Sequence, residues 1–376
     1  MSKAYSGVIE VNDRFFEDNT DGMDPQLARK YRAWVPMIQN EIQQYFPRTP
    51  SPEWLSQTLG FVDMDPLPIR DMIVEPTYLY VDRPGKLLRP ILAGLVLEAY
   101  GGEVRRFLSV LAMAELMEVT TISMNDIWDD SIYRRGGYCT HVVHDKEVAH
   151  AAALAAYAYC LAFLFNNNYA LAEDTALRLY NAFSFEDAQM FLGDIVETLW
   201  PVFKKETVSE AHFFQEVASR CAFLSFRGPA RIGAILGGAT EEEVGHWEMF
   251  GMLIGLAYHL RGDNLNVAPQ SASWGKLPYE DLTAGRRSLL TSYTILAATA
   301  DDRHELLDIL SSKTTDVRLI ERLIERIKHY GAVEKCEMRA TALLEQAKTH
   351  LDATTLPQER KDLLWTFAEF MIRRKK

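Results

Sequence analysis

The stretch Asn125-Asp-Ile-Trp-Asp-Asp-Ser-Ile-Tyr-Arg-Arg-Gly136 brings three carboxylates and two guanidinium groups together within twelve residues. It follows an almost entirely apolar run, Phe107 to Met124, whose pattern predicts a buried helix. If that helix continues, Asp126, Asp129 and Asp130 stand at positions i, i+3 and i+4 and project from one face. Oxygen ligands arranged in this way suit a hard divalent cation such as magnesium.

The two arginines of this stretch, Arg134 and Arg135, add a second kind of ligand chemistry. A guanidinium group binds phosphate oxygens through a rigid fork of donors, and magnesium usually bridges a carboxylate to substrate phosphates. A solvated, mixed-charge helix end is the simpler interpretation of such a cluster taken alone. The apolar run before it favours a site for magnesium and a diphosphate, because it places the acids at the end of a core helix.

The composition is that of an ordinary globular protein with an ample core: 48% of the 376 residues are hydrophobic and 24% are charged. The formal net charge of -12 disfavours nucleic acid as a partner, and no basic stripe with interleaved aromatic residues is present. The segment Met1 to Asp21 is polar and acidic, without the apolar core of a signal peptide, so we expect a cytoplasmic protein.

The richest apolar run, Ala149 to Phe165, is slightly short for a bilayer span. We interpret it as a buried helix and expect no stable membrane insertion. The widely spaced cysteines indicate neither a disulfide framework nor a zinc site, so we expect them to be reduced and structural. They are Cys139, Cys160, Cys221 and Cys336.

Helical periodicity dominates the chain and strand signals are nearly absent, which predicts an all-α fold. No linker or change of composition divides the chain, so we expect one domain over 61–376, preceded by a partly helical N-terminal extension over 1–60. The predicted helices are 25–45, 66–80, 87–99, 105–124, 148–167, 170–181, 185–200, 210–235, 241–265, 289–300, 303–311, 317–330, 331–353 and 357–372.

A second acidic segment, Arg261-Gly-Asp-Asn-Leu-Asn266, ends the apolar helix that begins near Glu241. Asp263 and Asn266 would share a helix face, although a simple helix stop explains this segment equally well when it is taken alone. The polar loop 274–288 beyond it carries further basic residues. Upstream, Pro84-Gly-Lys-Leu-Leu-Arg-Pro90 places two basic side chains three residues apart behind a glycine that permits close backbone approach.

The order of these motifs, from about Tyr80 to Ser288, resembles the trans-isoprenyl diphosphate synthase (polyprenyl synthetase) family, most closely the geranylgeranyl diphosphate synthase type. The resemblance implies an all-helical bundle around an apolar cavity, with two aspartate-rich motifs facing each other and three magnesium ions between them. An allylic prenyl diphosphate of geranyl to geranylgeranyl length would ionise there, and in the family isopentenyl diphosphate then attacks the allylic cation. A homodimer is expected by the same analogy.

Carried over by position, both aspartate-rich motifs of the family depart from their pattern at the first acid. Asn125 keeps an oxygen ligand but brings no charge, and Gly262 removes a carboxylate altogether. The resemblance assigns catalytic roles to Asp126, Asp129 and Asp263. The predicted metal ligands are Asn125, Asp126, Asp129, Asp130, Asp263 and Asn266.

The basic residues of the family's two diphosphate sites are nearly all present. Arg134 matches the arginine that contacts the allylic diphosphate, and Arg135 matches the one that contacts isopentenyl diphosphate. Arg220-Cys221 replaces a Lys-Thr pair, and 193–197 replaces a Gly-Gln-x-x-Asp motif. The predicted diphosphate-binding residues are Lys86, Arg89, Arg134, Arg135, Arg220, Lys276 and Arg286.

The sharpest departure is Glu118, which stands where the family has a histidine that helps to hold isopentenyl diphosphate. A carboxylate there should repel a diphosphate, unless it pairs with Lys86, Arg89 or Arg135 and is merely structural. Our main expectation is therefore a terpene-synthase-like enzyme that ionises the allylic substrate without isopentenyl diphosphate and lets the cation cyclise, lose a proton or capture water. On this hypothesis Glu118→His should create elongation activity.

Two alternatives remain open at the level of sequence. Ordinary elongation to farnesyl or geranylgeranyl diphosphate is supported by the intact basic residues, and a non-catalytic subunit of a hetero-oligomeric synthase is suggested by Asn125 and Gly262. Thr120 and Thr121 stand where bulky aromatic residues cap shorter pockets in the family, so a pocket open to a farnesyl or geranylgeranyl chain is expected. Aromatic candidates to steady a cation are Trp128, Phe223, Phe226 and Tyr258.

Overall fold

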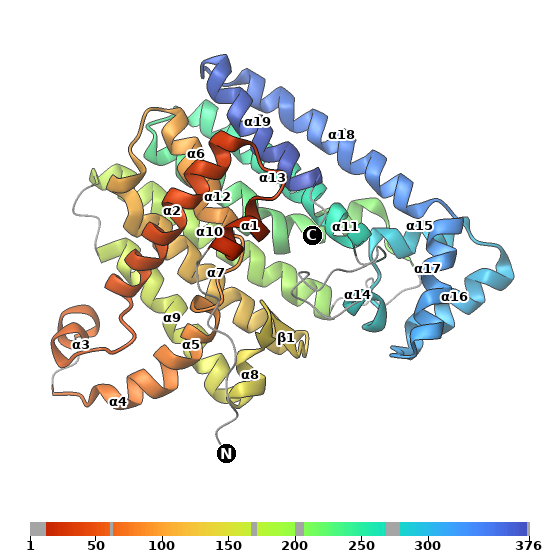
Figure 1. Cartoon of the computed structure of the whole chain (residues 1–376), viewed down its shortest axis with the longest axis horizontal. Coiled ribbons are helices and arrows are strands. Elements are labelled where there is room, and N and C mark those ends of the chain that lie inside the picture. Colours follow the sequence, from red (N-terminus) through yellow and green to blue (C-terminus); the bar gives the residue numbers. More distant parts are fainter. Residues whose placement is uncertain are drawn as a thin grey trace. The chain divides into compact units, whose positions relative to one another are not determined.

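Helices make up almost all of the part of the chain that the computed structural model describes, which confirms the prediction of an all-α fold (Figure 1). The described residues are 13–60, 63–166, 171–199, 207–265, 267 and 279–373. The chain divides into two compact units, one formed by 1–183 with 235–238 and the other by 184–234 with 239–376. The described helices of the predicted N-terminal extension belong to the first unit, and the boundary at residue 60 stays a prediction.

The first unit is built around a long apolar helix, α7 (Leu108–Trp128), which α2, α5, α6 and α9 contact. Several of its other helices begin with an aspartate or serine N-cap followed directly by proline, as at Asp24-Pro25 and Ser51-Pro52, a combination that satisfies early backbone donors and presets the helical φ. Its elements are α1 (Asp13–Thr20), α2 (Pro25–Tyr45), α3 (Pro52–Leu59), α4 (Pro66–Ile69), the π-helical η1 (Arg70–Val74), α5 (Glu75–Val81), α6 (Leu88–Ala99), the 3-10 turn η2 (Val104–Phe107), α7, β1 (Tyr133–Arg134), β2 (Gly137–Tyr138), α8 (Thr140–Val143), α9 (Lys146–Asn166) and the start of α10 (Glu173–Leu199).

The second unit is built around α13 (Glu241–Leu265), which packs against both η4 and α18. This helix begins with a reciprocal cap, because the Glu243 N–H donates to Oγ1 of Thr240 while the Thr240 N–H donates to the Glu243 carboxylate. The remaining elements are α11 (Glu210–Val217), the π-helical η4 (Ala218–Arg227), α12 (Gly228–Leu236), α14 (Glu280–Thr283), α15 (Leu289–Ala297), α16 (Ala300–Ser312), α17 (Val317–His329), α18 (Ala332–Ala353) and α19 (Gln358–Arg373).

Glycines let η4 approach its neighbours closely on two sides. A Cβ at Gly193 of α10 would lie 2.7 Å from the backbone nitrogen of Arg220, and a Cβ at Gly251 of α13 would lie 2.5 Å from the carbonyl oxygen of Phe226. Real side chains do not tolerate such distances, so these two helices can contact η4 in this way only where they lack a Cβ. Gly193 thereby allows α10 to pack directly against the backbone of Arg220.

Three sequence expectations about helices differ from the structure. The segments 170–181 and 185–200 were expected as two helices, but α10 runs continuously over Glu173–Leu199 because Ala182 to Ser184 contains no breaker. The short hairpin β1–β2 is missing from the prediction. The regions 66–80 and 210–235 include π-helical turns, which periodicity at 3.6 residues cannot distinguish from α-helix.

The prediction that Ala149 to Phe165 forms a buried helix is half wrong. Two helical spans, Val104–Trp128 and Lys146–Asn166, are long and apolar enough to cross a bilayer by length and composition. The first is 83% buried inside its unit over its most apolar window, but the second is only 44% buried. One side of α9 packs against α7, and the other exposes apolar residues such as Leu154 and Phe165.

Candidate active site

Asp126, on the last turn of α7, is fully buried and already engaged on both carboxylate oxygens. Its Oδ1 accepts hydrogen bonds from Nε of Arg134 at 2.8 Å and from Nη2 of the same guanidinium, a forked geometry. Its Oδ2 accepts from the Tyr80 hydroxyl and lies 3.4 Å from the Cys139 sulfur. Burial, reinforced by the charge of Asp126, raises the pKa of the Cys139 thiol to about 12, so this thiol stays protonated and can donate.

The tight hairpin β1–β2 directs the two arginines of the motif. Residue pairs Tyr133–Tyr138 and Arg134–Gly137 close a loop of two residues, and both loop residues adopt positive φ, 49° at Arg135 and 76° at Gly136. A two-residue hairpin loop of this kind matches the natural twist of the strands, and glycine adopts it without strain. Arg134 then reaches Asp126, while Arg135 reaches Glu115, about three turns earlier on α7.

Arg83 fastens this hairpin to the end of α5. Its guanidinium is 4% exposed and donates to three backbone carbonyls, those of Leu79 at 2.6 Å, Arg134 at 3.1 Å and Tyr138 at 2.9 Å. Gly137 makes room for it, because a Cβ at that position would lie 1.9 Å from Nη1 of Arg83. Sequence analysis missed this residue; a lone arginine beside the Gly-Lys motif carries no spacing signal.

We expect Gly137→Ala to displace Arg83 and to misplace the hairpin that carries both arginines. An overpacked site of this kind typically costs about 1–3 kcal/mol, so the KM for the diphosphate substrates should rise roughly tenfold or more. Gly245→Ala is the matched control, because Gly245 lies in α13 with no atom near its missing Cβ. Steady-state kinetics of both variants would check this, and an unchanged KM in a folded Gly137→Ala protein would contradict it.

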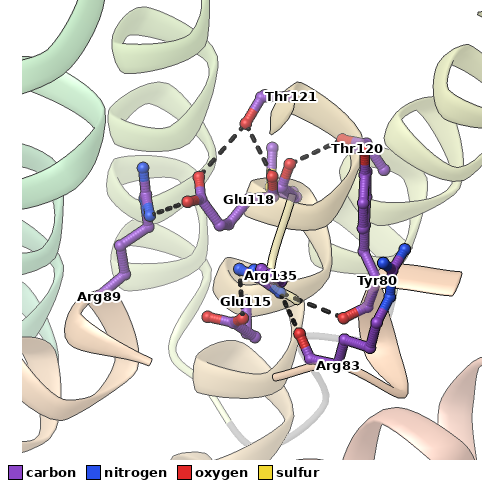
Figure 2. A network of polar contacts seen from close by, with 9 residues as sticks. Tyr80, Arg83, Arg89, Glu115, Glu118, Thr120, Thr121 and Arg135 are labelled. Atoms are coloured by element: carbon purple, nitrogen blue, oxygen red, sulfur yellow. Dashed lines mark hydrogen bonds and ion pairs between the residues drawn. The ribbon is translucent and has the colours of Figure 1, made fainter. Parts of the chain in front are cut away.

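A second polar cluster lies two to three turns before Asp126 along α7 (Figure 2). Glu118 points toward Arg89, at the start of α6, with 2.5 Å between Oε1 and Nη1. Glu115 lies toward Arg135, with 3.4 Å between Oε1 and Nη2, and Arg135 also donates to the Tyr80 carbonyl at 3.2 Å. The pKa of Glu115 is raised to about 7, mainly by burial; the charge of Glu118 contributes to the rise, and both arginines oppose it.

Sequence analysis overlooked Glu115, although a second glutamate three residues before Glu118 in an apolar helix was a visible signal. The two glutamates and two arginines form a charge-neutral group, which we call the acceptor-side quartet: Arg89, Glu115, Glu118 and Arg135. Of the alternatives left open for Glu118, pairing with a basic residue is the one observed. Lys86 lies in the loop that leads into α6.

The two threonines predicted to shape a pocket differ in their surroundings. Thr120 lines a narrow space between α5, α7, α8 and α9, together with small residues such as Thr77, Ala152 and Ala153. Thr121 does not line that space; its hydroxyl donates to the carbonyl of Glu118 at 3.0 Å. Their role in setting chain length stays a prediction.

In the second unit, Asp263 lies on the last turn of α13 and is 8% exposed. Its Oδ1 is 3.6 Å from Nε2 of His259, one turn earlier, and its buried Oδ2 accepts no hydrogen bond from any described residue. Burial raises the pKa of Asp263 well above the usual carboxyl range, the charge of Asp281 adds to this rise, and Arg220 opposes it.

The basic residues of this unit are held by carboxylates. Nε of Arg220 lies 2.5 Å from Oε1 of Glu216 and 3.8 Å from Oδ1 of Asp194, and Nε of Arg286 lies 3.5 Å from Oδ1 of Asp281. Asn266 and Lys276, both predicted site residues, lie outside the described residues. Of the suggested cation-steadying rings, Phe226 packs on Tyr258 with centroids 5.0 Å apart, Trp128 is 37% exposed, and the Phe223 side chain lies outside the description.

The prediction for Asp130 is wrong in its geometry. Helix α7 ends at Trp128, Asp129 caps it, and Asp130 turns away with a positive φ of 50°. Its exposed carboxylate pairs with Nζ of Lys146 at 2.5 Å. Asp130 therefore does not share a helix face with Asp126 and Asp129.

The remaining donors fit magnesium bound mainly through substrate phosphates. The buried Oδ1 of Asn125 accepts no hydrogen bond from any described residue, and Asp129 follows one turn later. In the other unit the unsatisfied Oδ2 of Asp263 is an equivalent donor. Among the described ranges no three His, Cys, Asp or Glu side chains gather into a metal-binding cluster.

Comparison with known proteins gives a consistent result. The polyprenyl synthetase family model matches residues 70–327. A short chain isoprenyl diphosphate synthase of Methanothermobacter thermautotrophicus is 27% identical over 292 residues, 77% of this chain and 86% of that protein. A geranylgeranyl diphosphate synthase of Methanosarcina mazei is 27% identical over 311 residues, covering 80% and 91%. A geranylgeranyl pyrophosphate synthase from Corynebacterium glutamicum, solved with isoprenyl diphosphate and magnesium, has the same fold with a TM-score of 0.79, 22% identity, and coverage of 91% and 99%.

These relatives overturn our main expectation of a terpene-synthase-like outcome. They are named as diphosphate synthases, which matches the elongation alternative instead. The physical argument failed at Glu118, because this carboxylate is not an isolated charge but is neutralised by Arg89. The chain therefore belongs to the polyprenyl synthetase family, of trans-isoprenyl diphosphate synthases similar to the geranylgeranyl type, and it is a prenyltransferase enzyme.

Proposed function

We propose that this protein is a short-chain prenyl diphosphate synthase that joins an allylic prenyl diphosphate to isopentenyl diphosphate. The observation that carries the proposal is the pair of arginines on one hairpin. Arg134 and Arg135 are adjacent, yet they pair with different carboxylates, Asp126 and Glu115, which lie about three turns apart on α7. Two fixed guanidinium groups on one rigid turn suit an enzyme that must hold two diphosphates at once.

Different residues of the site would bind the two diphosphates of the proposed reaction. Arg134, oriented by Asp126, would bind the allylic diphosphate as it leaves and stabilise its growing charge. Arg135, with Lys86 and Arg89, would hold the diphosphate of the acceptor. The apolar faces of the helices around Thr120 would exclude water from the allylic cation, so that the double bond of the acceptor is the nucleophile that reaches it.

Magnesium is the proposed cofactor, with three ions when substrate is bound. In the first unit Asn125 and Asp129 would be ligands, and in the second unit Asp263 would be one, because carboxylate and amide oxygens fit a hard cation. The buried oxygens of Asn125 and Asp263 accept no hydrogen bond from any described residue, which supports these assignments. When bound, the metal supplies positive charge that makes diphosphate a better leaving group. Asp126 was predicted as a further ligand, and in this structure it serves Arg134.

The direct test is incubation of the protein with magnesium and geranyl, farnesyl or geranylgeranyl diphosphate, with and without isopentenyl diphosphate. We expect longer prenyl diphosphates, detected by mass spectrometry, only when isopentenyl diphosphate is present. Hydrocarbons or alcohols formed in its absence, without any longer diphosphate, would contradict the proposal. The length of the product would show how deep the pocket near Thr120 becomes when substrate enters.

We further propose that the protein is a cytoplasmic homodimer that inserts stably in no membrane and binds no nucleic acid. The described cysteines, Cys139, Cys160 and Cys336, are buried free thiols, as suits a reducing compartment, and the net charge of -12 would be repelled by anionic polymers and lipids. The exposed apolar face of α9, which includes Leu154 at 54% and Phe165 at 63% exposure, supports an interface with a second copy.

Charges on the exposed face of α9 should prevent dimer formation. We expect the double substitution Leu154→Glu with Phe165→Glu to convert a dimer into monomers, measured by size-exclusion chromatography with light scattering, because each carboxylate would be desolvated in the interface. The matched control is Met338→Glu, at a methionine on α18 that is 66% exposed. A wild-type monomer at micromolar concentration would refute the proposed dimer.

A further inference from the structure

The acceptor-side quartet holds as many carboxylates as guanidinium groups, although its arginines are the ones we propose to bind a diphosphate. Arg89 and Glu118 are 14% and 11% exposed at their side chains, and Arg135 and Glu115 are 11% and 6% exposed. Within such a buried group the net charge, more than any single contact, decides whether an anion is attracted. A neutral quartet offers a diphosphate little net attraction.

Both carboxylate oxygens of Glu118 have polar neighbours in this group. It contacts Arg89 at 2.5 Å, and the Thr121 hydroxyl, 3.4 Å from Oε2, lies against its other oxygen (Figure 2). Nη1 of Arg89 cannot bind a phosphate oxygen at the same point while Oε1 of Glu118 occupies it. On the proposed function, the Glu118 carboxylate would therefore compete with a phosphate oxygen of the acceptor for this guanidinium.

Glu115 is the member of the quartet that can change its charge near neutral pH, since its pKa lies at about 7. The charged groups that face it are Glu118 on the same helix, Arg89 on α6 and Arg135 on the hairpin. From α2 the buried hydroxyl of Tyr31 also faces it, accepts and donates no hydrogen bond among the described residues, and has its pKa raised by burial and then by the charge of Glu115. An incoming diphosphate would raise the pKa of Glu115 further and favour its protonated form.

We propose that Glu118 sets the affinity for the acceptor by competing with its diphosphate for Arg89, and that acceptor binding is accompanied by proton uptake at Glu115. This inference rests on the proposed function, because it concerns the acceptor site of that reaction. It makes the KM for isopentenyl diphosphate sensitive to pH. Below about pH 7 Glu115 is neutral and the quartet carries one positive charge; as pH rises through that value the charge, and with it the affinity, is lost.

The first experiment compares wild type with Glu118→Gln, which keeps the size and hydrogen-bonding oxygen of the side chain but removes its charge. We expect the KM for isopentenyl diphosphate to fall roughly tenfold at pH 8, with the KM for the allylic substrate unchanged. The matched control is Glu98→Gln, which removes a carboxylate that pairs with Lys30 on the same unit outside the quartet. Equal KM values for the acceptor in all three proteins would overturn the inference.

The second experiment measures the proton uptake directly. Titration calorimetry of isopentenyl diphosphate with magnesium into the wild-type protein, in buffers of different ionisation enthalpy, counts the protons taken up on binding. We expect uptake of a fraction of one proton at pH 7.5, reduced in Glu118→Gln, and binding without uptake would overturn the coupling. Failure of the proposed function would look different, because no longer prenyl diphosphate would then form at any pH or acceptor concentration.

Discussion

Replacing Asp263 with asparagine should lower kcat roughly a thousandfold, about 4 kcal/mol of transition-state stabilisation, while leaving the protein at least as stable as the wild type. On the proposed function, Asp263 supplies the carboxylate ligand of the second motif, because Gly262 beside it has no carboxylate. Its buried Oδ2, which accepts no hydrogen bond from any described residue, costs the folded state free energy that a bound cation would offset. Asparagine removes the charge without changing the shape of the side chain.

The stability effect should depend on pH in a defined direction. The pKa of Asp263 is raised in the folded state by burial and by Asp281, so its contribution to stability is fully present below the usual carboxyl range and is lost as pH rises through the folded-state pKa. Thermal unfolding without metal should therefore show Asp263→Asn gaining stability over wild type at pH 8 but not at pH 4. Asp308→Asn, at an exposed carboxylate of α16 paired with His304, is the control that should show neither change.

Loss of kcat together with higher stability would separate a functional carboxylate from a structural one. If Asp263→Asn retained full activity with saturating magnesium, Asp263 would have no part in holding the cofactor. If it lost both activity and fold, its buried oxygen would have a structural partner instead.

Breaking the Arg134–Asp126 pair from the two sides should have unequal effects on the free energy of unfolding. Arg134→Met strands a fully buried carboxylate and should cost about 3–5 kcal/mol. Asp126→Asn should cost less, because Arg134 is 18% exposed at its side chain and can turn toward water. The double variant should recover most of the stability lost in Arg134→Met without recovering activity, since the allylic diphosphate would still lack its arginine.

Urea unfolding of the four proteins forms a double-mutant cycle that measures the coupling energy directly. The exposed pair Arg318–Asp316 offers a control cycle in the second unit, where coupling should be below about 1 kcal/mol. Additive effects of Arg134→Met and Asp126→Asn would show that the forked contact adds nothing to stability.

The sequence predicted where helices form more reliably than where they end. Apolar periodicity predicted α13 to the residue, because a capping box begins it and Gly-Asp-Asn follows its apolar stripe. The end of α7 was misjudged because no local sequence signal at Asp129 or Asp130 shows that the chain leaves the helix there to form a hairpin. Arg83 holds this hairpin through a hydrogen bond to the carbonyl of Arg134, which is a tertiary contact between residues 51 positions apart.

In the candidate site, too, the sequence identified individual residues but not the side chains that they contact. Family motifs singled out Arg89, Arg134 and Arg135, whose role in binding diphosphate stays a prediction. All three pair with carboxylates of α7, and these partners could not be predicted from spacing alone. The error at Glu118 arose because its charge was weighed without a partner. A buried carboxylate beside an arginine repels an anion far less than an isolated one, and only coordinates distinguish the two.

The glycines that flank η4 have a consequence for how this protein can vary between species. A π-helical turn contains one residue more than the α-helical turn it replaces, so deletion of one residue from 218–227 would rotate every later side chain of α12 by about 100°. Gly193 of α10 and Gly251 of α13 allow these two helices to pack closely against η4. In aligned relatives, segment length at this point and glycine at these two positions should therefore change together, which gives a criterion for recognising proteins that share this geometry even when their aspartate-rich motifs differ.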